Sequence, residues 1–342
     1  MNKKNFYFNK KILVAGGTGL VGQPLVKRLL KLNAKVFIAS RDGKGLCPSD
    51  IKKFYKTDLT SLKNCLKVTK GKDIVFNLLG VTGSPMINEI YPASFMMGNL
   101  NLALNMLEAS KINKVKNYLF TSTYGVYGPS MPMKESNVWK TFPSEHDKYA
   151  GWAKRIAELQ IEAYRKEYKF RGLHIVRAGN IFGPYSNYNP KNSMVVSSLI
   201  KRIIEKEDPL IVWGDGSAVR DFVYSEDVAE SMIKIVKSNI EEPINIGSGK
   251  GYSIKKLVNT ICNSKYMNNL PKIIFDRNKP TGDKKRVLDT RKAKKYKVLK
   301  VSDFQSSIDK TILWYKENKD KTKLRYSFFK WNFTIKLSEL RI

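Results

Sequence analysis

A chain of 342 residues, 42% of them hydrophobic, is long enough to bury a sizeable core in one large α/β domain or two smaller ones. The formal net charge of +32 attracts anions, but lysines spread singly and in pairs along the chain argue against a nucleic-acid site. Three widely spaced cysteines and two histidines lack metal-ligand spacing, and no apolar run reaches the ~18–20 residues of a membrane span. We therefore expect a cytoplasmic protein that binds no metal or nucleic acid and does not associate with membranes.

From residue 11 onward, short β-branched runs alternate with helical patterns, which is typical of a doubly wound parallel sheet. We predict strands at 11–16, 35–40, 73–80, 116–123, 172–180 and 242–249, and helices at 23–33, at 99–110 and from Gly151 to about Tyr168. After about residue 181 the chain turns to loops rich in Pro, Asn and Gly, and then to further helices.

This order predicts an α/β fold with a Rossmann-type doubly wound parallel sheet and a smaller, interleaved C-terminal substrate lobe. The nucleotide-binding domain would span 1–180, with returning elements at about 210–250, and the lobe would span 181–315. Residues 316–342 form a basic, aromatic extension. Packing of this extension on the body is the simpler interpretation, and an anchor at an acidic lipid surface is the alternative.

The segment "VAGGTGLVG" places Gly16, Gly19 and Gly22 between the first predicted strand and the first predicted helix. Glycines there permit a tight turn and a close approach by a pyrophosphate, which the amides of the helix N-terminus can bind. A glycine turn without a ligand is the simpler reading, but the position between strand and helix argues for a site. The Gly-x-x-Gly-x-x-Gly spacing resembles the extended branch of the short-chain dehydrogenase/reductase superfamily. The resemblance implies a nicotinamide cofactor held by Gly16, Thr18, Gly19, Leu20 and Gly22.

The end of the second strand bears on which nicotinamide cofactor is bound. Dinucleotide sites that bind NAD usually place an acidic residue there against the ribose 2′-hydroxyl. In "FIASRDG" that place is taken by Ser40 and is followed by Arg41, and a hydroxyl with a guanidinium suits a 2′-phosphate. We therefore predict NADP, with NAD as the alternative if Asp42 turns toward the ribose. By resemblance, Asp58 and its neighbour Leu59 would lie against the adenine.

The segment "FTSTYGVYG" resembles the family's active-site strand end, in which Thr123 would hydrogen-bond the sugar oxygen that is oxidised or reduced. The dehydratase subgroup follows this residue with Asp-Glu, whereas this chain has Tyr124 and Gly125, so a 4,6-dehydratase is disfavoured. Fucose-synthase-like members use a Cys here and a His in a later Gly-Pro loop. This chain lacks that Cys and has Tyr185 in "FGPYSNYNP".

The segment "KYAGWAKRIAELQ" resembles the family's catalytic helix but departs from it at one position. Gly151 to Lys154, and then Glu158, follow the family's Tyr-Gly-x-x-Lys-x-x-x-Glu pattern, yet the Tyr position is occupied by Ala150. By resemblance, Lys154 would hold the nicotinamide ribose and lower the pKa of a catalytic Tyr. Tyr149 and Tyr124 are the candidates to replace that Tyr, and for each an ordinary aromatic role is at least as well supported. Since one residue on a helix is ~100° of rotation, Tyr149 can serve only if the helix begins after it.

The segment "LIVWGDGSAVRDFVYSEDVAE" resembles the family stretch in which an Arg, here Arg220, binds the diphosphate of a nucleotide-sugar. Asn180 in "RAGNIFGP" and Arg286 in "KPTGDKKRVLD" match two further phosphate-binding positions, and Tyr185 would complete the substrate site. A single such Arg could be a surface ion pair of little energetic value, but three positions in the expected order argue for a site.

Together these motifs, which cover roughly residues 11–315, identify a member of the NAD-dependent epimerase/dehydratase family. The resemblance implies hydride transfer at a sugar carbon, usually C4, of a nucleoside-diphosphate sugar, as an epimerase or a reductase. It also implies a homodimer through helices at 94–110 and 151–168. The rival interpretation is a nucleotide-binding or scaffold protein that kept the fold and lost catalysis with the Tyr.

Overall fold

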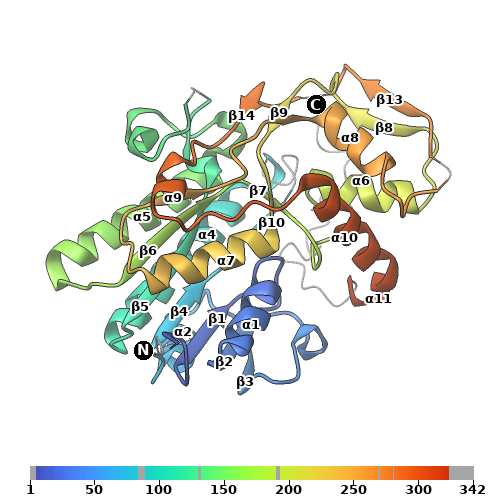
Figure 1. Ribbon diagram of the computed structural model, residues 1–342. Helices are drawn as coiled ribbons and strands as arrows, with labels where there is room; N and C mark the ends of the chain where they lie inside the picture. The colour runs from blue at the N-terminus through green and yellow to red at the C-terminus, as the bar shows by residue number, and fades with distance from the viewer. Residues whose placement is uncertain are drawn as a thin grey trace.

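The computed structural model describes residues 5–83, 89–129, 132–189, 193–268, 270–279 and 281–322. A seven-stranded sheet in the order β11-β6-β5-β4-β1-β2-β3 forms its centre, and every neighbouring pair is parallel (Figure 1). The strands are β1 Lys11–Ala15, β2 Lys35–Ser40, β3 Lys53–Lys56, β4 Ile74–Asn77, β5 Asn117–Thr123, β6 Leu173–Ala178 and β11 Ile244–Ile246. The order, which reverses at β1 and β4, is that of a Rossmann-type sheet, so the predicted fold class is confirmed.

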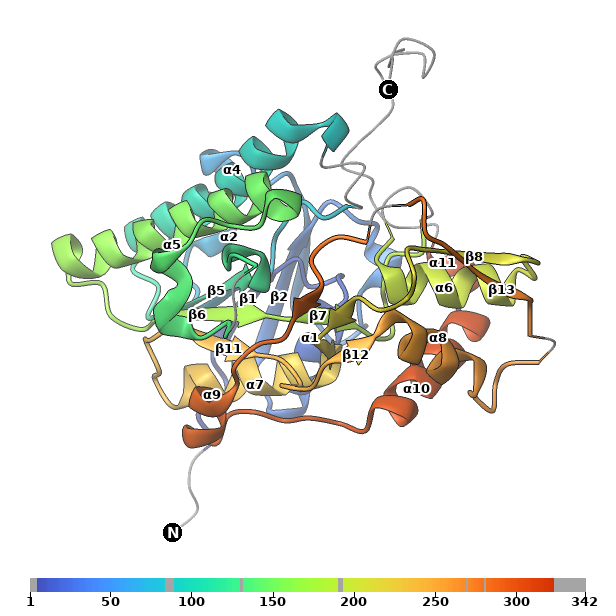
Figure 2. The same ribbon diagram turned by 90° about the horizontal axis from the view of Figure 1, so that it is seen from above.

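Helices cover both faces of the sheet, as Figure 2 shows. On one face lie α1 Gly22–Lys31 and α7 Ser225–Lys237, and on the other lie α2 Leu62–Thr69, α4 Pro92–Ile112 and α5 Lys148–Tyr168. The strands read as continuous apolar runs because both of their faces are buried. In β1, Ile12 and Val14 belong to the core under α1 and α7, whereas Leu13 and Ala15 belong to the core under the other three helices. Alternate side chains of one strand thus supply two separate cores.

A smaller lobe lies beyond the carboxyl ends of the strands, at the right of Figure 1. It contains α6 Val195–Ile204, α8 Ile254–Cys262, α10 Phe304–Glu317 and α11 Lys319–Thr322, with the strand pair β8 Leu210–Trp213 and β13 Ile273–Asp276. A third core cluster, rich in aromatic residues such as Phe182, Phe222 and Tyr315, holds this lobe together.

Two small sheets join the lobe to the central sheet. One pairs β7 Asn180–Phe182 with β10 Phe222–Tyr224, and the other joins β12 Tyr252–Ser253, β9 Val219–Arg220 and β14 Lys285–Arg286. The register pairs Arg286 directly with Arg220. A short helix α9, Arg291–Lys295, and 3-10 helices η1 Lys44–Leu46, η2 Tyr124–Val126, η3 Glu135–Lys140 and η4 Glu145–Asp147 complete the described elements.

Each of the six predicted strands corresponds to a strand of the central sheet, including the returning 242–249 segment as β11. The sequence analysis missed β3, whose residues KFYK combine lysines with aromatics at an edge of the sheet. It also placed the start of α5 at Gly151, whereas the helix begins at Lys148. None of the helices described is long and apolar enough to cross a membrane. The predicted extension starts at residue 316, and its residues 316–322 include the end of α10 and all of α11. The rest of the extension, beyond Thr322, lies outside the described residues.

Candidate active site

The glycine turn after β1 requires its glycines at two positions. Gly16 has a φ of +82°, which side chains rarely adopt, and a Cβ on Gly22 would lie 2.2 Å from the Gly16 carbonyl oxygen. α1 begins at Gly22 with no acidic residue in its first turn. The turn therefore lets a ligand approach the backbone closely, and the partial positive charge of the α1 N-terminus is not neutralised by an acidic side chain in its first turn. Both features suit a pyrophosphate.

The end of β2 carries a polar cluster that faces this turn. The hydroxyls of Thr18 and Ser40 are 2.8 Å apart, and Thr18 also donates to Asp42 Oδ2 at 2.7 Å. The Asp42 amide in turn donates to Ser40 Oγ at 3.1 Å. Asp42 is thus turned toward the glycine turn, an arrangement that the sequence analysis left open.

The residues predicted to contact adenine follow β3 at the same edge of the sheet. Asp58 Oδ1 accepts a hydrogen bond from the Thr60 amide at 3.0 Å, which closes the turn after the strand. Leu59 is buried in the core under α2, α4 and α5. Asp58 therefore lies at the predicted adenine end, whereas the Leu59 side chain packs in the core.

Lys154 on α5 is buried between two strand ends. Its Nζ donates to the Thr121 carbonyl at 2.9 Å and to the Leu79 carbonyl at 3.1 Å. Burial lowers the pKa of Lys154 to about 8, an effect that the negative charge of Glu158 opposes. A Cβ on Gly80 would lie 3.6 Å from Nζ, so the approach to the ammonium is lined by bare backbone on that side.

The start of α5 packs tightly against the loop that follows β5. A Cβ on Gly151 would lie 2.5 Å from the Gly125 carbonyl oxygen, so only glycine permits this contact. The Gly125 amide donates to Thr123 Oγ1 at 3.1 Å, which fixes the Thr123 hydroxyl at the carboxyl end of β5. The helix and the predicted active-site hydroxyl are therefore held in one rigid unit.

The helix start decides the geometry of Tyr149. Since α5 begins at Lys148, Tyr149 is already helical and its side chain is rotated ~100° from position 150. Ala150 packs at the edge of the core under α2, α4 and α5. The condition under which Tyr149 could take over the missing position, a helix that begins after it, is not met.

Tyr124 and Asn180 form a second polar unit at the same strand ends. The Tyr124 hydroxyl donates to Asn180 Oδ1 at 2.7 Å. Burial raises the pKa of Tyr124, although the charges of Arg286 and Arg220 oppose the shift. Asn180 Nδ2 is buried and has no hydrogen-bond partner among the described residues. A buried donor without a partner is costly, and a ligand oxygen would satisfy it.

Arg220 and Arg286 are neighbours across β9 and β14 beside Tyr124. Arg286 is 5% exposed, and its guanidinium lies 4.3 Å from the Tyr124 ring centroid. Arg220 donates to the backbone carbonyls of Asp283 at 2.6 Å and Val219 at 2.9 Å. Two adjacent guanidinium groups repel each other, so anionic groups beside them stabilise the arrangement.

Two carboxylates that the sequence analysis missed lie against these arginines. Asp147 Oδ2 accepts a hydrogen bond from Arg286 Nη1, and Asp283 Oδ2 lies 3.5 Å from Arg286 Nε. A Cβ on Gly125 would lie 3.3 Å from both Asp147 Cγ and Thr123 Cγ2, so Asp147 is also close to Thr123. Its position immediately before α5 was the available signal, because Asp is common at helix N-caps.

Tyr185 lies between α1 and the smaller lobe. Its hydroxyl accepts a hydrogen bond from Lys27 of α1, and its ring lies 4.8 Å from that of Trp314 in α10. Tyr185 therefore bridges the nucleotide domain and the lobe. The substrate role predicted for it stays a prediction.

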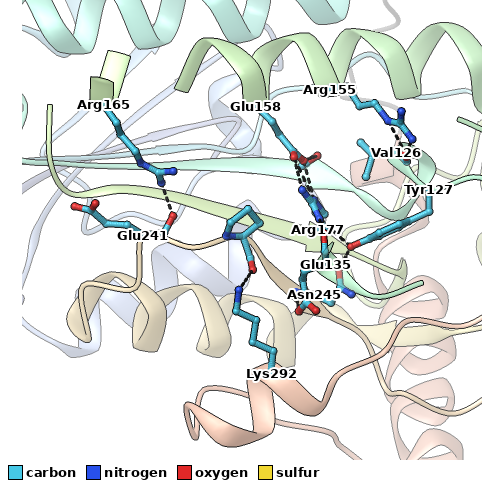
Figure 3. Close-up of polar contacts among 12 residues, drawn as sticks. Val126, Tyr127, Glu135, Arg155, Glu158, Arg165, Arg177, Glu241, Asn245 and Lys292 are labelled. Atoms are coloured by element: carbon cyan, nitrogen blue, oxygen red, sulfur yellow. Dashed lines mark hydrogen bonds and ion pairs between the residues drawn. The ribbon is translucent and has the colours of Figure 1, made fainter. Parts of the chain in front are cut away.

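A second arginine–carboxylate pair lies behind the site, between β6 and α5 (Figure 3). Arg177 and Glu158 are 2% and 3% exposed and form a bidentate pair with a shortest distance of 2.6 Å. Ser122 donates to Glu158 at 2.6 Å, and Arg177 also donates to the Tyr127 hydroxyl and the Glu135 carbonyl, both at 3.0 Å. This network fixes α5, and with it Lys154, against the sheet.

Within the described ranges, no group of three or more His, Cys, Asp or Glu side chains is arranged to hold a metal ion.

Comparisons with known proteins place these features in a family. Residues 12–247 match the model of the NAD dependent epimerase/dehydratase family. GDP-mannose 3,5-epimerase 1 of Oryza sativa subsp. japonica is 28% identical over 260 residues, which cover 73% of this chain and 68% of the relative. GDP-L-fucose synthase of Escherichia coli (strain K12) is 25% identical over 332 residues, which cover 91% and 98%. The solved UDP-N-acetylglucosamine 4-epimerase from Methanobrevibacter ruminantium M1, in complex with UDP-N-acetylmuramic acid, superposes with a TM-score of 0.81 at 25% identity and covers 91% of this chain and 99% of that one.

Proposed function

The chain belongs to the NAD dependent epimerase/dehydratase family, and from that premise we propose that it transfers hydride at a sugar carbon of a nucleoside-diphosphate sugar, as an epimerase or reductase. The observation that carries the proposal is the cluster of two guanidinium groups, Arg220 and Arg286, beside Tyr124. A glycine turn and a buried lysine at the same sheet edge complete a site with two anion-binding ends. That combination suits a dinucleotide at one end and a diphosphate ester at the other.

The diphosphate of the substrate would bind to Arg220 and Arg286. Guanidinium groups bind phosphate oxygens in bidentate fashion, which orients the ligand as well as attracting it. Asn180 Nδ2, a buried donor without a partner in the described part of the chain, would donate to a phosphate or sugar oxygen. The sugar would then extend from the diphosphate toward Thr123 and Tyr124.

A nicotinamide cofactor, when bound, would supply or accept the hydride. The glycine turn and the N-terminus of α1 would hold its pyrophosphate, and Lys154 would hold its ribose. We propose NADP because Ser40 ends β2 and Arg41 follows it, where NAD-binding sites usually have an acidic residue. Asp42 opposes this preference, since its carboxylate faces Thr18 in the same region. The balance between Arg41 and Asp42 therefore sets the preference.

Thr123 would orient the sugar oxygen, and Tyr124 would transfer the proton. Tyr124 is favoured over Tyr149 because Tyr149 lies inside α5, rotated away from position 150. A neutral phenol can protonate an oxygen that receives a hydride, and the charges of Arg286 and Arg220 oppose the rise that burial causes in the pKa of Tyr124.

Separate changes of Tyr124 and Tyr149 to Phe test this assignment. We expect Tyr124→Phe to lower kcat by ~10²–10⁴-fold, the range of a general acid, and Tyr149→Phe to leave kcat within about twofold. Nucleotide-sugar affinity should change little in both variants. If neither change alters turnover, both proposed replacements for the missing Tyr are wrong.

The second candidate function is a silenced nucleotide-binding or scaffold protein, and Ala150 at the Tyr position favours it. Mass spectrometry of ligands released from the purified protein would identify a retained cofactor and nucleotide. Calorimetry with NADPH and nucleotide-sugars, followed by a turnover assay, separates the two functions. Tight binding of both ligands without turnover would replace the enzyme with the scaffold.

We also propose that two copies of the chain pair through α4 and α5. Both helices present large apolar side chains outward: Met97 is 53% exposed, Leu159 52% and Ile156 36%. Apolar side chains gathered on neighbouring helices are typical of a protein interface. Light scattering of the wild type should give twice the monomer mass, and Leu159→Glu should give the monomer. A monomeric wild type at micromolar concentration would contradict the pairing.

A further inference from the structure

Two carboxylates balance the charges of the two arginines. Arg220 and Arg286 carry two positive charges, and Asp147 and Asp283 carry two negative ones. A nucleoside diphosphate carries at least two negative charges, and a cluster without net charge would attract it only weakly. High affinity therefore requires one carboxylate to move away from Arg286.

The two carboxylates differ in how easily they can leave. Asp283 is 13% exposed, and its backbone carbonyl accepts from Arg220 at 2.6 Å. Asp147 is 35% exposed, whereas its partner Arg286 is 5% exposed and packed on the Tyr124 ring. The arginine is thus fixed and the Asp147 side chain lies at the rim, so Asp147 is the displaceable anion.

Asp147 also has a second place to bind. It is the N-cap residue of α5, but its side chain accepts no hydrogen bond from the helix because it is paired with Arg286. Asp is among the preferred N-cap residues, and the unbonded amides of a helix N-terminus attract a carboxylate. Asp147 has φ −118° and ψ 13°, whereas a capping residue is usually extended, so exchange of the guanidinium for these amides requires its backbone to turn as well as its side chain.

We propose that Asp147 is an internal competitor for the diphosphate-binding Arg286, and that ligand binding transfers its carboxylate to the N-terminus of α5. This inference rests on the proposed function only in the identity of the ligand; the competition itself concerns any diphosphate. It gives α5, which also carries Lys154, a direct connection to the diphosphate end of the site. Binding of a diphosphate at Arg286 then stabilises the start of α5, the helix that carries Lys154 at the cofactor end.

The test measures binding of UDP, GDP and inorganic diphosphate by calorimetry at about 50 mM salt. Asp147→Asn removes the competing charge but keeps an N-cap residue of the same shape, so we expect each ligand to bind about 3- to 30-fold more tightly. Glu145→Gln is the matched control, because Glu145 lies in the same 3-10 helix and pairs with Lys148, not with an arginine of the site. The control should bind like the wild type.

Asp147→Ala tests whether the carboxylate moves to the N-terminus of α5. It removes the competing charge and also the cap, so its affinity should rise less than that of Asp147→Asn. Equal gains in the two variants would contradict the transfer to α5.

The remaining outcomes are also decisive. Unchanged or weaker binding by Asp147→Asn overturns the competition. If the wild type and Asp147→Asn bind none of the three ligands, the competition is overturned together with the proposed diphosphate site. If Asp147→Asn gains affinity for inorganic diphosphate while neither protein binds UDP or GDP, the competition stands and the proposed substrate class fails.

Discussion

Two arginine–carboxylate pairs of this protein have the same chemistry but different surroundings. In the Arg177–Glu158 pair both side chains are nearly inaccessible, at 2% and 3% exposed, and Ser122 and Tyr127 complete their hydrogen bonds. In the Arg286–Asp147 pair the arginine is 5% exposed but the aspartate is 35% exposed. The first pair has no room for a ligand, whereas the second is open on its acidic side.

The difference indicates two roles. Separating a buried pair with complete hydrogen bonds would leave an unpaired charge in the interior. Such a pair therefore fixes the position of the helix or strand that carries it. For Arg177, burial alone would lower the pKa, but Glu158 raises it above the ordinary value and keeps the charge. A pair with one exposed partner can exchange that partner for a ligand. The same residue types thus make a structural crosslink behind α5 and, in front of it, the pair at which we propose that the ligand binds.

The largest expected effect comes from breaking the structural pair, Arg177–Glu158. Glu158→Gln keeps the shape but leaves the Arg177 charge buried and unpaired, which we expect to lower the free energy of unfolding by ~3–5 kcal/mol. Urea denaturation measures this loss. Glu242→Gln, which removes the more exposed partner of Lys292, should cost less than ~1 kcal/mol. Equal losses in the two variants would erase the distinction between buried and exposed pairs.

The next effect concerns the ligand-binding pair. Arg286→Lys keeps the charge but loses the planar guanidinium that can bind two phosphate oxygens at once. UDP or GDP should therefore bind about 10- to 100-fold more weakly. Calorimetry measures the loss, and Arg291→Lys is the control because Arg291 is 78% exposed and pairs with Asp289. Wild-type affinity in Arg286→Lys, in a protein that remains folded in urea titration, would show that the diphosphate binds elsewhere.

A third effect concerns Lys154, which the structural pair holds in place. Its pKa is lowered to about 8, so the ammonium is present below that pH and is lost above it. NADPH affinity should therefore fall as the pH rises through 8, by up to about tenfold per unit. Lys154→Arg stays charged, so its affinity, although lower at neutral pH, should not show this fall. A pH-independent wild type would mean that the ammonium does not contact the cofactor.

The smallest effect concerns the cofactor end. Asp42→Ala removes a carboxylate near the predicted 2′-phosphate, so NADPH should gain about 2- to 5-fold relative to NADH, and Arg41→Ala should lose a similar factor. Fluorescence titration with both cofactors measures the ratio. If neither change alters the ratio of NADPH to NADH affinity, the ribose 2′ position of the cofactor lies away from both residues.

Much of the fold and the glycine turn could be predicted from the sequence because their signals are local. The glycine turn lies between adjacent elements, and the buried strands are continuous apolar runs. The Asp147–Arg286 pair could not be predicted, since it joins the start of α5 to a two-residue strand of the lobe. Tyr149 shows a second limit: the rotation of its side chain depends on the residue at which α5 begins, and helix starts are poorly marked in sequence.

The most direct test of the proposed chemistry is deuterium transfer. The purified protein is incubated with NADPH deuterated at both C4 hydrogens and a set of nucleoside-diphosphate 4-ketosugars, and the sugar products are examined by mass spectrometry. We predict a product that carries one deuterium on the sugar with wild-type protein, and at least a hundredfold less with Tyr124→Phe. Wild-type protein that binds both ligands and transfers no deuterium to any sugar would contradict the account.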